Sequence, residues 1–511
     1  GIEESVKAFF RAKAWALLHD PPHKMWALYG TLRLTGKGHE EEALEVWRRL
    51  GLNDVFGDPA ECEEIVRRAD DMASTSDRWI TNFSFAEVRE VFEYDKLHNV
   101  FNPRFSTLIG QLERRGLEEF LGQLAGKLKR FTDPREAYHA LYALYEVEWV
   151  ARGLPPSLAD TRAPTHTLFD HAYATALALN LLWPDEGVGG YAVLVDIPGI
   201  QQVVGAARKT GDFWAGSWMI SAVTWLTLWP FVWEFGADTL LKPSPRYNPY
   251  YHATLWAQLK GDNGLWSSFG NLYGKLYSSL YPGGLPKFEP QLSSFKPQHV
   301  IRQPVIPGTA CLILPKVRPN GQKLEKSSLE REVREKFERA FELILAFASG
   351  EGEVSEEPYA AFFKLLSGRA TSTEQAPKSV VKLFKIIRDN EPKAFEGLLR
   401  PRVCVVDVSE LYARWLKVVK GEAEAARRGA EILRGLAVAR AKLAELGIDK
   451  EEAAKRLTWQ ALFALLYSEL SSRAAEELVA PKAWFTVEGR ELKPIACFEK
   501  FYDSGGGVGY I

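Results

Sequence analysis

The chain has 511 residues, of which 46% are hydrophobic and 25% charged, and its formal net charge is −2. This length predicts two to four domains, and the balanced charge excludes a global positive field, so nucleic-acid binding would need local patches or partner subunits. The four cysteines lie far apart along the chain, which excludes a zinc ribbon and a secreted disulfide framework.

Residues 1–185 are predicted to be almost entirely helical. Segments 4–18, 41–52 and 61–74 place apolar residues at helical spacing. Residues 99–106, NVFNPRFS, are predicted to be a loop, and the turn-rich segment 183–190 ends this part of the chain. The charged first twenty residues do not form a signal peptide, so we expect a cytoplasmic protein.

The pattern changes to strands and helices after residue 190. Residues 190–199 form a short β-branched run that ends in Pro-Gly, which is typical of a buried strand. A long helix or a helix pair is predicted over 200–229. The apolar segment 219–235 contains Pro230 and Glu234, so we expect a buried core helix there and no membrane span. A second strand is predicted at 310–316 and a charged helix at 327–348.

The remaining chain is predicted to be mostly helical, with one strand within 402–416 and an amphipathic helix over 420–447. A glycine loop then leads into a strand at 508–511. The fold class is therefore α+β multidomain. The boundaries expected are a helical domain over 1–185, a sheet domain over 186–350, a helical domain over 351–490, and the start of a further, truncated or absent sheet domain over 491–511.

Histidine and aspartate gather in the first third of the chain. Seven of the nine histidines lie at or before position 171, and three clusters of histidine or aspartate stand out: His19-Asp20 with His23, Asp70-Asp71, and Asp160, His166, Asp170 and His171. Imidazole and carboxylate together suit Mn, Fe, Ni, Co or Zn, provided that a helical bundle brings the clusters together. The alternative is a structural one, in which Asp20-Pro-Pro ends a helix and the paired aspartates are solvated.

These motifs resemble a known family. LLHDPPHK, ADDMASTSDR and ADTRAPTHTLFDHAYATALAL are similar to a permuted HD phosphohydrolase domain. LVDIPGIQQVVGAARKTGDFWAGSWMIS is similar to the start of the first palm domain in the large subunit of type III CRISPR effectors. The palm-entry residues are Gln201, 207–210, 212–214 and 216–217, and the type III-B (Cmr) version is the most similar. The resemblance covers residues 10–350 well and the later helical part only loosely.

The resemblance implies a metal-dependent single-strand DNase in the HD domain, with His19 and Asp20 as its catalytic doublet. It adds five candidate metal ligands, Asp70, Asp71, His171, His23 and His166, and a divalent ion, either Mn, Ni or Co, or Mg. It also implies a ferredoxin-like palm that binds ATP, with candidate residues Asp196, Gln201, Arg208, Lys209 and Ser217. For Asp196, Arg208 and Lys209, a structural role in packing is the alternative.

The function implied is that of the large subunit of an RNA-guided antiviral complex, whose partners are the other Cmr subunits, guide RNA, target RNA and single-stranded DNA. The 511 residues contain no Gly-Gly-Asp-Asp, so cyclic oligoadenylate synthesis is not expected of them. Two alternatives stay open: a free-standing HD phosphohydrolase that acts on nucleotides, and a structural scaffold with an inactive HD domain.

Overall fold

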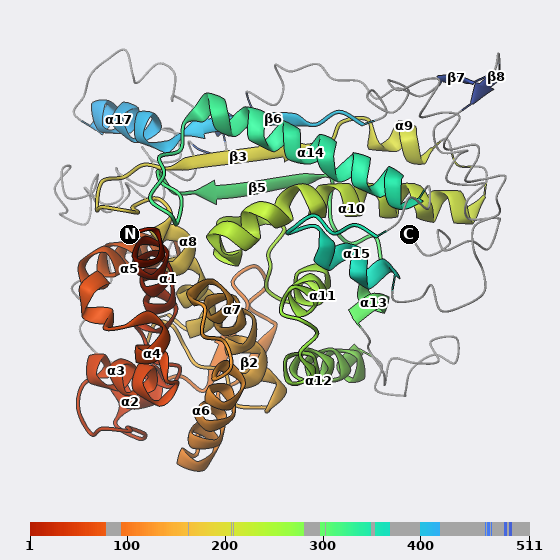
Figure 1. The fold of residues 1–511 in the computed structure, drawn as a ribbon. Coiled ribbons are helices and arrows are strands. Elements are labelled where there is room, and N and C mark those ends of the chain that lie inside the picture. Colours follow the sequence, from red (N-terminus) through yellow and green to blue (C-terminus); the bar gives the residue numbers. More distant parts are fainter. Residues whose placement is uncertain are drawn as a thin grey trace. The chain divides into compact units, whose positions relative to one another are not determined.

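The computed structural model describes residues 1–77, 93–161, 163–205, 207, 209–280, 297–301, 303–348, 353–367, 399–419, 466, 468–470, 472, 485–487 and 490–492. The chain divides into two compact units, and Figure 1 labels helices and strands of both. The first comprises Gly1–Ala192, Ile313–Leu324 and Val406–Glu469, and the second comprises Val193–Leu312, Glu325–Val405 and Leu470–Ile511.

The first unit is built around helix α1. Its elements are α1 (Ile2–Leu18), α2 (Lys24–Tyr29), α3 (His39–Arg49), α4 (Leu52–Phe56), η1 (Pro59–Cys62), α5 (Glu63–Asp77), α6 (Arg114–Leu128), α7 (Pro134–Ala151), α8 (Leu168–Leu179) and α17 (Val408–Val419). Helix α1 packs against α5, α7 and α8, and α5 packs against α8. The second half of α1, from Phe9 to Leu18, is buried, so the core of the unit lies where these four helices meet.

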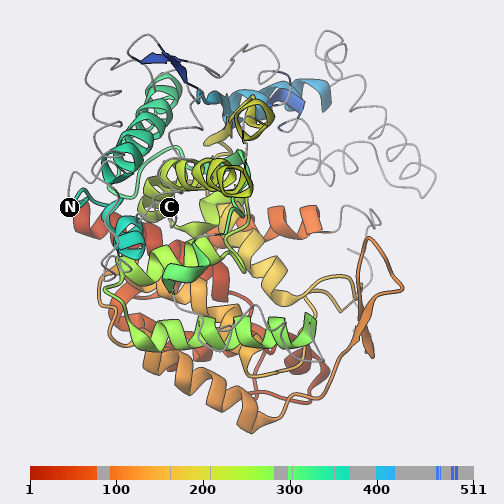
Figure 2. The same cartoon turned by 90° about the vertical axis from the view of Figure 1, so that its right-hand side faces the viewer.

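A short hairpin is the exception to the helical first third. Strands β1 (Lys96–His98) and β2 (Ser106–Leu108) pair antiparallel, with Lys96 opposite Leu108. The hairpin is orange in Figure 2, where it extends away from the helices. The predicted loop over 99–106 is therefore mostly the turn of a hairpin. The strands escaped notice because three residues are too few to show an alternating pattern.

A four-stranded sheet lies mostly in the second unit. It contains β3 (Tyr191–Asp196), β4 (Leu240–Lys242), β5 (Thr309–Leu314) and β6 (Arg402–Asp407) in the order β4-β5-β3-β6, and β4 and β5 are antiparallel. Helix α10 (Thr210–Phe235) follows β3, and helix α14 (Lys326–Ala348) follows β5 and packs against α10. The remaining elements are α9 (Ile200–Val204), η3 (Ala237–Thr239), α11 (Pro249–Gln258), α12 (Asn263–Leu280), α13 (Pro297–Val300) and α15 (Ala360–Ser367). A mixed helix-and-sheet fold is confirmed.

Helix α10 forms much of the core of this unit. Trp218, Trp225 and Trp229 are each at most 1% exposed, and the buried core helix predicted over 219–235 is confirmed. Among the helices that the structure describes, none is long and apolar enough to cross a membrane. The separate helices α9 and α10 confirm the predicted helix pair.

The predicted strand within 402–416 is β6, and α17 follows it directly. Strand β6 pairs beside β3, so a stretch expected to lie in a helical domain contributes a strand to the sheet. A further antiparallel pair joins β7 (Phe485–Val487) to β8 (Arg490–Leu492). The helix predicted over 420–447 and the strand predicted at 508–511 lie outside the described residues.

Candidate metal centre

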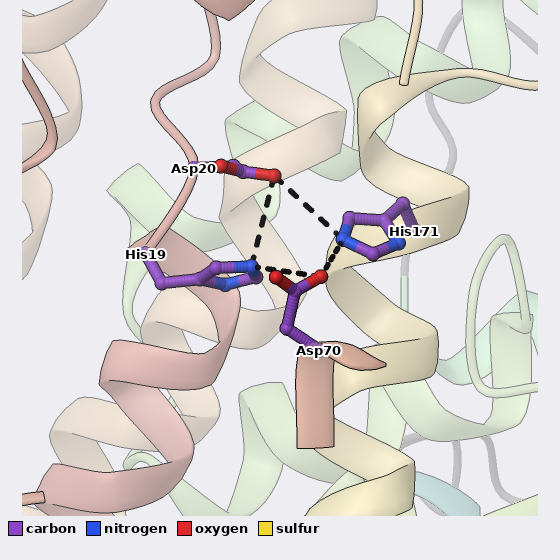
Figure 3. Close-up of side chains that lie close together, drawn as sticks. All are labelled: His19, Asp20, Asp70 and His171. Carbon is purple, nitrogen blue, oxygen red and sulfur yellow. Dashed lines mark ion pairs between the residues drawn. The ribbon is translucent and has the colours of Figure 1, made fainter. Parts of the chain in front are cut away.

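Four side chains from the predicted clusters meet in the first unit. Potential ligand atoms of His19, Asp20, Asp70 and His171 all lie within 4.8 Å of one another, and Figure 3 shows the four side chains pointing toward a common centre. His19 Nε2 lies 3.6 Å from Asp20 Oδ2 and 3.5 Å from Asp70 Oδ1. His171 Nε2 lies 3.6 Å and 2.8 Å from the same two oxygens. These four are among the seven metal ligands predicted from the sequence, and the fold brings them together.

Helix ends and helix packing position these residues. His19 is the C-cap of α1, and Pro21 and Pro22 follow it, so Asp20 leaves the helix beside His19. His171 lies in the first turn of α8, which a capping box begins: Thr167 Oγ1 accepts from the Asp170 amide, and Asp170 Oδ2 accepts from the Thr167 amide. Since α1 and α5 both pack on α8, the three helices converge at the cluster.

Both histidines have one ring nitrogen occupied, which leaves Nε2 for the centre. His19 Nδ1 lies 2.8 Å from the carbonyl oxygen of Ala16, and His171 Nδ1 lies 2.9 Å from Asp77 Oδ2. His19 Nε2 is buried and has no hydrogen-bond partner among the described residues. A buried nitrogen without a partner is costly unless something else, such as a metal ion, occupies its lone pair.

The donor set fits a transition metal. Two imidazole nitrogens and two carboxylates suit Mn, Fe, Co, Ni or Zn. Metal–ligand bonds of about 2.0–2.2 Å place neighbouring ligand atoms about 3–3.5 Å apart, close to the observed separations of 3.5 and 3.6 Å. The shorter distance of 2.8 Å, between His171 Nε2 and Asp70 Oδ1, is that of a hydrogen bond, which binding of an ion would replace.

Charges within the cluster shift its proton affinities. Burial lowers the pKa of His171, but hydrogen bonds to Asp70 and Asp77 outweigh burial and raise that pKa to about 10. Burial also lowers the pKa of His19, and the charges of Asp20 and Asp70 outweigh it, so the net pKa is raised. For Asp70, burial raises the pKa, but the two histidines hold it well below its ordinary range. Without metal, the His171 imidazole is therefore protonated at neutral pH.

Metal binding is consequently expected to release protons. Ligand histidines must be neutral, so the apparent affinity for Mn²⁺ should rise about tenfold per pH unit for each proton displaced. In the metal-free protein, stability should change with pH in the opposite direction to metal affinity. The raised pKa of His171 stabilises the fold below about pH 6.5, and this contribution is lost as the pH rises through about 10. Titration calorimetry between pH 6.5 and 8.5, in buffers of different ionisation enthalpy, counts the protons. A pH-independent affinity with no proton release would contradict the assignment.

Three other predicted ligands lie elsewhere. Asp71 is exposed on α5. His23 is fully buried, and its Nε2 lies 2.6 Å from Glu42 Oε2. Burial lowers the pKa of His23, so the ring is neutral and donates a hydrogen bond to that carboxylate. Glu42 also accepts from the amides of Leu34 and Thr35 and from Thr35 Oγ1. His166 Nε2 lies 3.6 Å from Asp77 Oδ2. His23 thus secures a loop, and His166 contacts a residue behind the centre.

The structure describes four of the five predicted nucleotide-site residues. Asp196, at the end of β3, has Oδ1 2.7 Å from Thr309 Oγ1 and Oδ2 3.1 Å from the Arg402 guanidinium. Gln201 on α9 and Lys209 before α10 are exposed, and Ser217 is half-buried on α10. Arg208 lies outside the described residues. The contacts of Asp196 tie together three strands of the sheet.

Two residues beside the centre were not among the predicted ones. Asp77 contacts His171, and its signal was the spacing of seven residues from Asp70, which places both on one face of a helix. Lys24 Nζ lies 2.7 Å from Asp20 Oδ2. Burial lowers the pKa of Lys24, but Asp20 outweighs it, so the net pKa is raised and the ammonium stays charged. No helical spacing signalled it, because Asp20 and Lys24 flank the Pro21-Pro22 turn and do not share a helix.

Residues 192–345 match the family model described as CRISPR-associated protein Cmr2, N-terminal. Among curated proteins, the chain is similar to the CRISPR system CMR subunit Cmr2 of Saccharolobus solfataricus, with 28% identity over 342 residues, which cover 63% of this chain and 31% of that protein.

Solved structures agree with this similarity. A chain of type III-B Cmr-beta in the apo state matches with a TM-score of 0.59 and 25% identity over 78% of this chain and 37% of its own length. A chain of type III-B Cmr-beta bound to cognate target RNA matches with a TM-score of 0.52 and 25% identity over 77% of this chain and 36% of its own. The resemblance to the large subunit of type III-B effectors is confirmed. The chain spans about a third of the length of these relatives.

Proposed function

We propose that the chain acts as the large subunit of a type III-B CRISPR RNA-guided effector complex, and that its first unit is a metal-dependent single-strand DNase. The observation that carries the nuclease proposal is the convergence of His19, Asp20, Asp70 and His171. The similarity of the following segment to Cmr2 proteins supports the wider role. Other Cmr subunits, guide RNA and target RNA are the proposed partners, since a net charge of −2 leaves much of the RNA-binding surface to them.

The residues of the centre have distinct parts in the proposed reaction. His19, Asp20, Asp70 and His171 would hold Mn²⁺, Co²⁺ or Ni²⁺, which supplies Lewis acidity toward a phosphodiester. Lys24 fixes the orientation of Asp20 through its 2.7 Å contact, and its positive charge offsets the two carboxylates as an anionic strand approaches. Asp70 is the most exposed of the four, with 31% of its side chain accessible, so the strand would enter on its side.

For the sheet unit we propose a ferredoxin-like palm. Its elements follow the order β3-α10-β4-β5-α14-β6 with strand order β4-β5-β3-β6, which is the β-α-β-β-α-β arrangement of that fold. ATP binding to this palm is also a proposal. The exposed Gln201 and Lys209 are its best candidates, whereas the contacts of Asp196 to Thr309 and Arg402 favour the structural alternative for that aspartate.

The nuclease proposal is tested by cleavage of single-stranded DNA by the full chain with Mg²⁺, Mn²⁺, Ni²⁺ or Co²⁺. We expect His19→Ala/Asp20→Ala to reduce cleavage by about 1,000-fold or more, because the double change removes half of the ligands. Asp71→Asn, on the same helix as Asp70 but exposed, is the matched control and should cleave like the unaltered chain.

Other outcomes favour the alternatives. Turnover of dNTPs without single-strand cleavage would support a free-standing nucleotide phosphohydrolase. Equal cleavage by the double variant and the unaltered chain, or none by either, would support a scaffold with an inactive centre. Co-purification with Cmr subunits and guide RNA from a native extract tests the complex separately from the chemistry.

A further inference from the structure

Helix α5 contacts both ring nitrogens of His171. Asp70 Oδ1 lies 2.8 Å from Nε2, and Asp77 Oδ2 lies 2.9 Å from Nδ1. Seven residues make about two turns of helix, so the two carboxylates project from the same face of α5. Asp70 faces the centre, whereas Asp77 holds the side of the ring that faces away from it.

The contact between His171 Nδ1 and the Asp77 carboxylate is largely shielded from water. The side chain of His171 is 6% exposed and that of Asp77 is 15% exposed. When Nε2 of an imidazole binds a metal ion, the proton resides on Nδ1, which then needs an acceptor. In the described part of the first unit, the carboxylate of Asp77 contacts this nitrogen. Without it, the proton could move to Nε2 and block the ligand atom.

We propose that Asp77 is a positioning residue of the metal centre, which holds His171 as the Nδ1–H tautomer so that Nε2 offers its lone pair to the ion. This inference rests on the metal centre proposed above and adds a residue that binds no metal itself. The inference also accounts for the position of His166, because His166 Nε2 lies 3.6 Å from the same oxygen of Asp77. His166 contacts the carboxylate that orients a ligand.

The two histidines differ in a way that provides an internal control. His19 Nδ1 lies 2.8 Å from the main-chain oxygen of Ala16, a contact that replacement of a side chain does not remove. His171 Nδ1 depends on the side chain of Asp77. Loss of the Asp77 carboxylate should therefore affect one histidine and spare the other.

The test uses the full chain loaded with Co²⁺. Proton NMR of such a protein shows the Nδ1–H protons of ligand imidazoles as shifted signals that disappear in D₂O. We expect two signals in the unaltered chain. In Asp77→Ala, one should vanish through exchange while the other persists, and the Co²⁺ affinity should fall about 10- to 100-fold.

Two further variants sharpen the test. Asp77→Asn retains an oxygen that accepts the Nδ1–H and should keep both signals and most of the affinity. Asp71→Asn makes the same charge change on an exposed residue of α5 and should have no effect. Where Asp77→Ala does not fold, Asp77→Ser removes the carboxylate with a smaller disturbance of the helix end.

Three results would overturn the inference. Retention of both signals and full affinity in Asp77→Ala would show that Asp77 does not position His171. Equal weakening in Asp77→Asn and Asp77→Ala would assign the effect to charge instead of the hydrogen bond. Absence of Co²⁺ binding by the unaltered chain would remove the metal centre itself, and that failure is distinct from the other two.

Discussion

Asp70→Asn is expected to weaken Mn²⁺ binding by the full chain at least about 100-fold, more than loss of a residue behind the centre. Asp70 Oδ1 lies nearer than the Asp20 carboxylate to both Nε2 atoms, at 2.8 Å from His171 Nε2 and 3.5 Å from His19 Nε2. An amide in its place lacks the charge that a divalent cation requires. Equilibrium titration followed by the EPR signal of free Mn²⁺ measures the affinity.

Asp71→Asn is the control for this prediction, because it removes the same charge one residue further along α5 from an exposed position. Its affinity should stay within about twofold, as expected for a solvent-screened charge. Equal weakening by both changes would mean that general electrostatics holds the ion near the helix. Unchanged affinity in both would remove Asp70 from the ligand set.

Glu42→Ala is expected to destabilise the first unit by about 2–4 kcal/mol. The change leaves the buried His23 Nε2–H without its acceptor, together with the amides of the half-buried Leu34 and the exposed Thr35, and a buried donor left unsatisfied is costly. Urea unfolding of the full chain, followed by tryptophan fluorescence, measures the free energy of unfolding of this unit. Glu41→Ala, an exposed neighbour on α3, should cost less than about 1 kcal/mol.

The same carboxylate predicts a dependence on pH. Burial raises the pKa of Glu42, but hydrogen bonds from Leu34, Thr35 and His23 outweigh it and lower the pKa to about 2 from an ordinary 4.5. A depressed pKa contributes stability above the unfolded value and loses it as the pH falls through the folded value. The difference between the unaltered chain and Glu42→Ala should therefore shrink between pH 4.5 and 2. A constant difference across that window would contradict the role of Glu42.

The main helices and strands could be predicted because their sequence patterns are long or end abruptly at turn residues. The strand at β3 ends in Pro-Gly, and α14 has apolar residues at helical spacing, so both agree closely with the prediction. The hairpin β1–β2 could not be seen, since its strands have three residues each. The pairing of β6 with β3 is a long-range choice that no local pattern encodes.

The residue types of the metal cluster could be predicted from the sequence, but the individual residues that belong to it could be predicted only in part. His19, Asp20, Asp70 and His171 stood out as polar residues beside apolar helices. The sequence alone could not decide which of the adjacent Asp70 and Asp71 faces the cluster. Packing decides it, because α5 turns Asp70 toward α8 and leaves Asp71 exposed. His23 could not be separated from the ligands, since its partner Glu42 lies on another helix.

The position of β6 in the sheet has a consequence for synthesis of the chain. Strand β3 ends at Asp196, whereas the neighbour that covers one of its edges begins at Arg402. As the chain leaves the ribosome, helices α1 to α8 are complete long before that edge is covered, and domains fold in the order of their synthesis. Until β6 arrives, the exposed main-chain groups of β3 can pair with another nascent chain. Slower translation lengthens this interval, so yield of the folded protein should depend on the rate at which residues 197–407 are made.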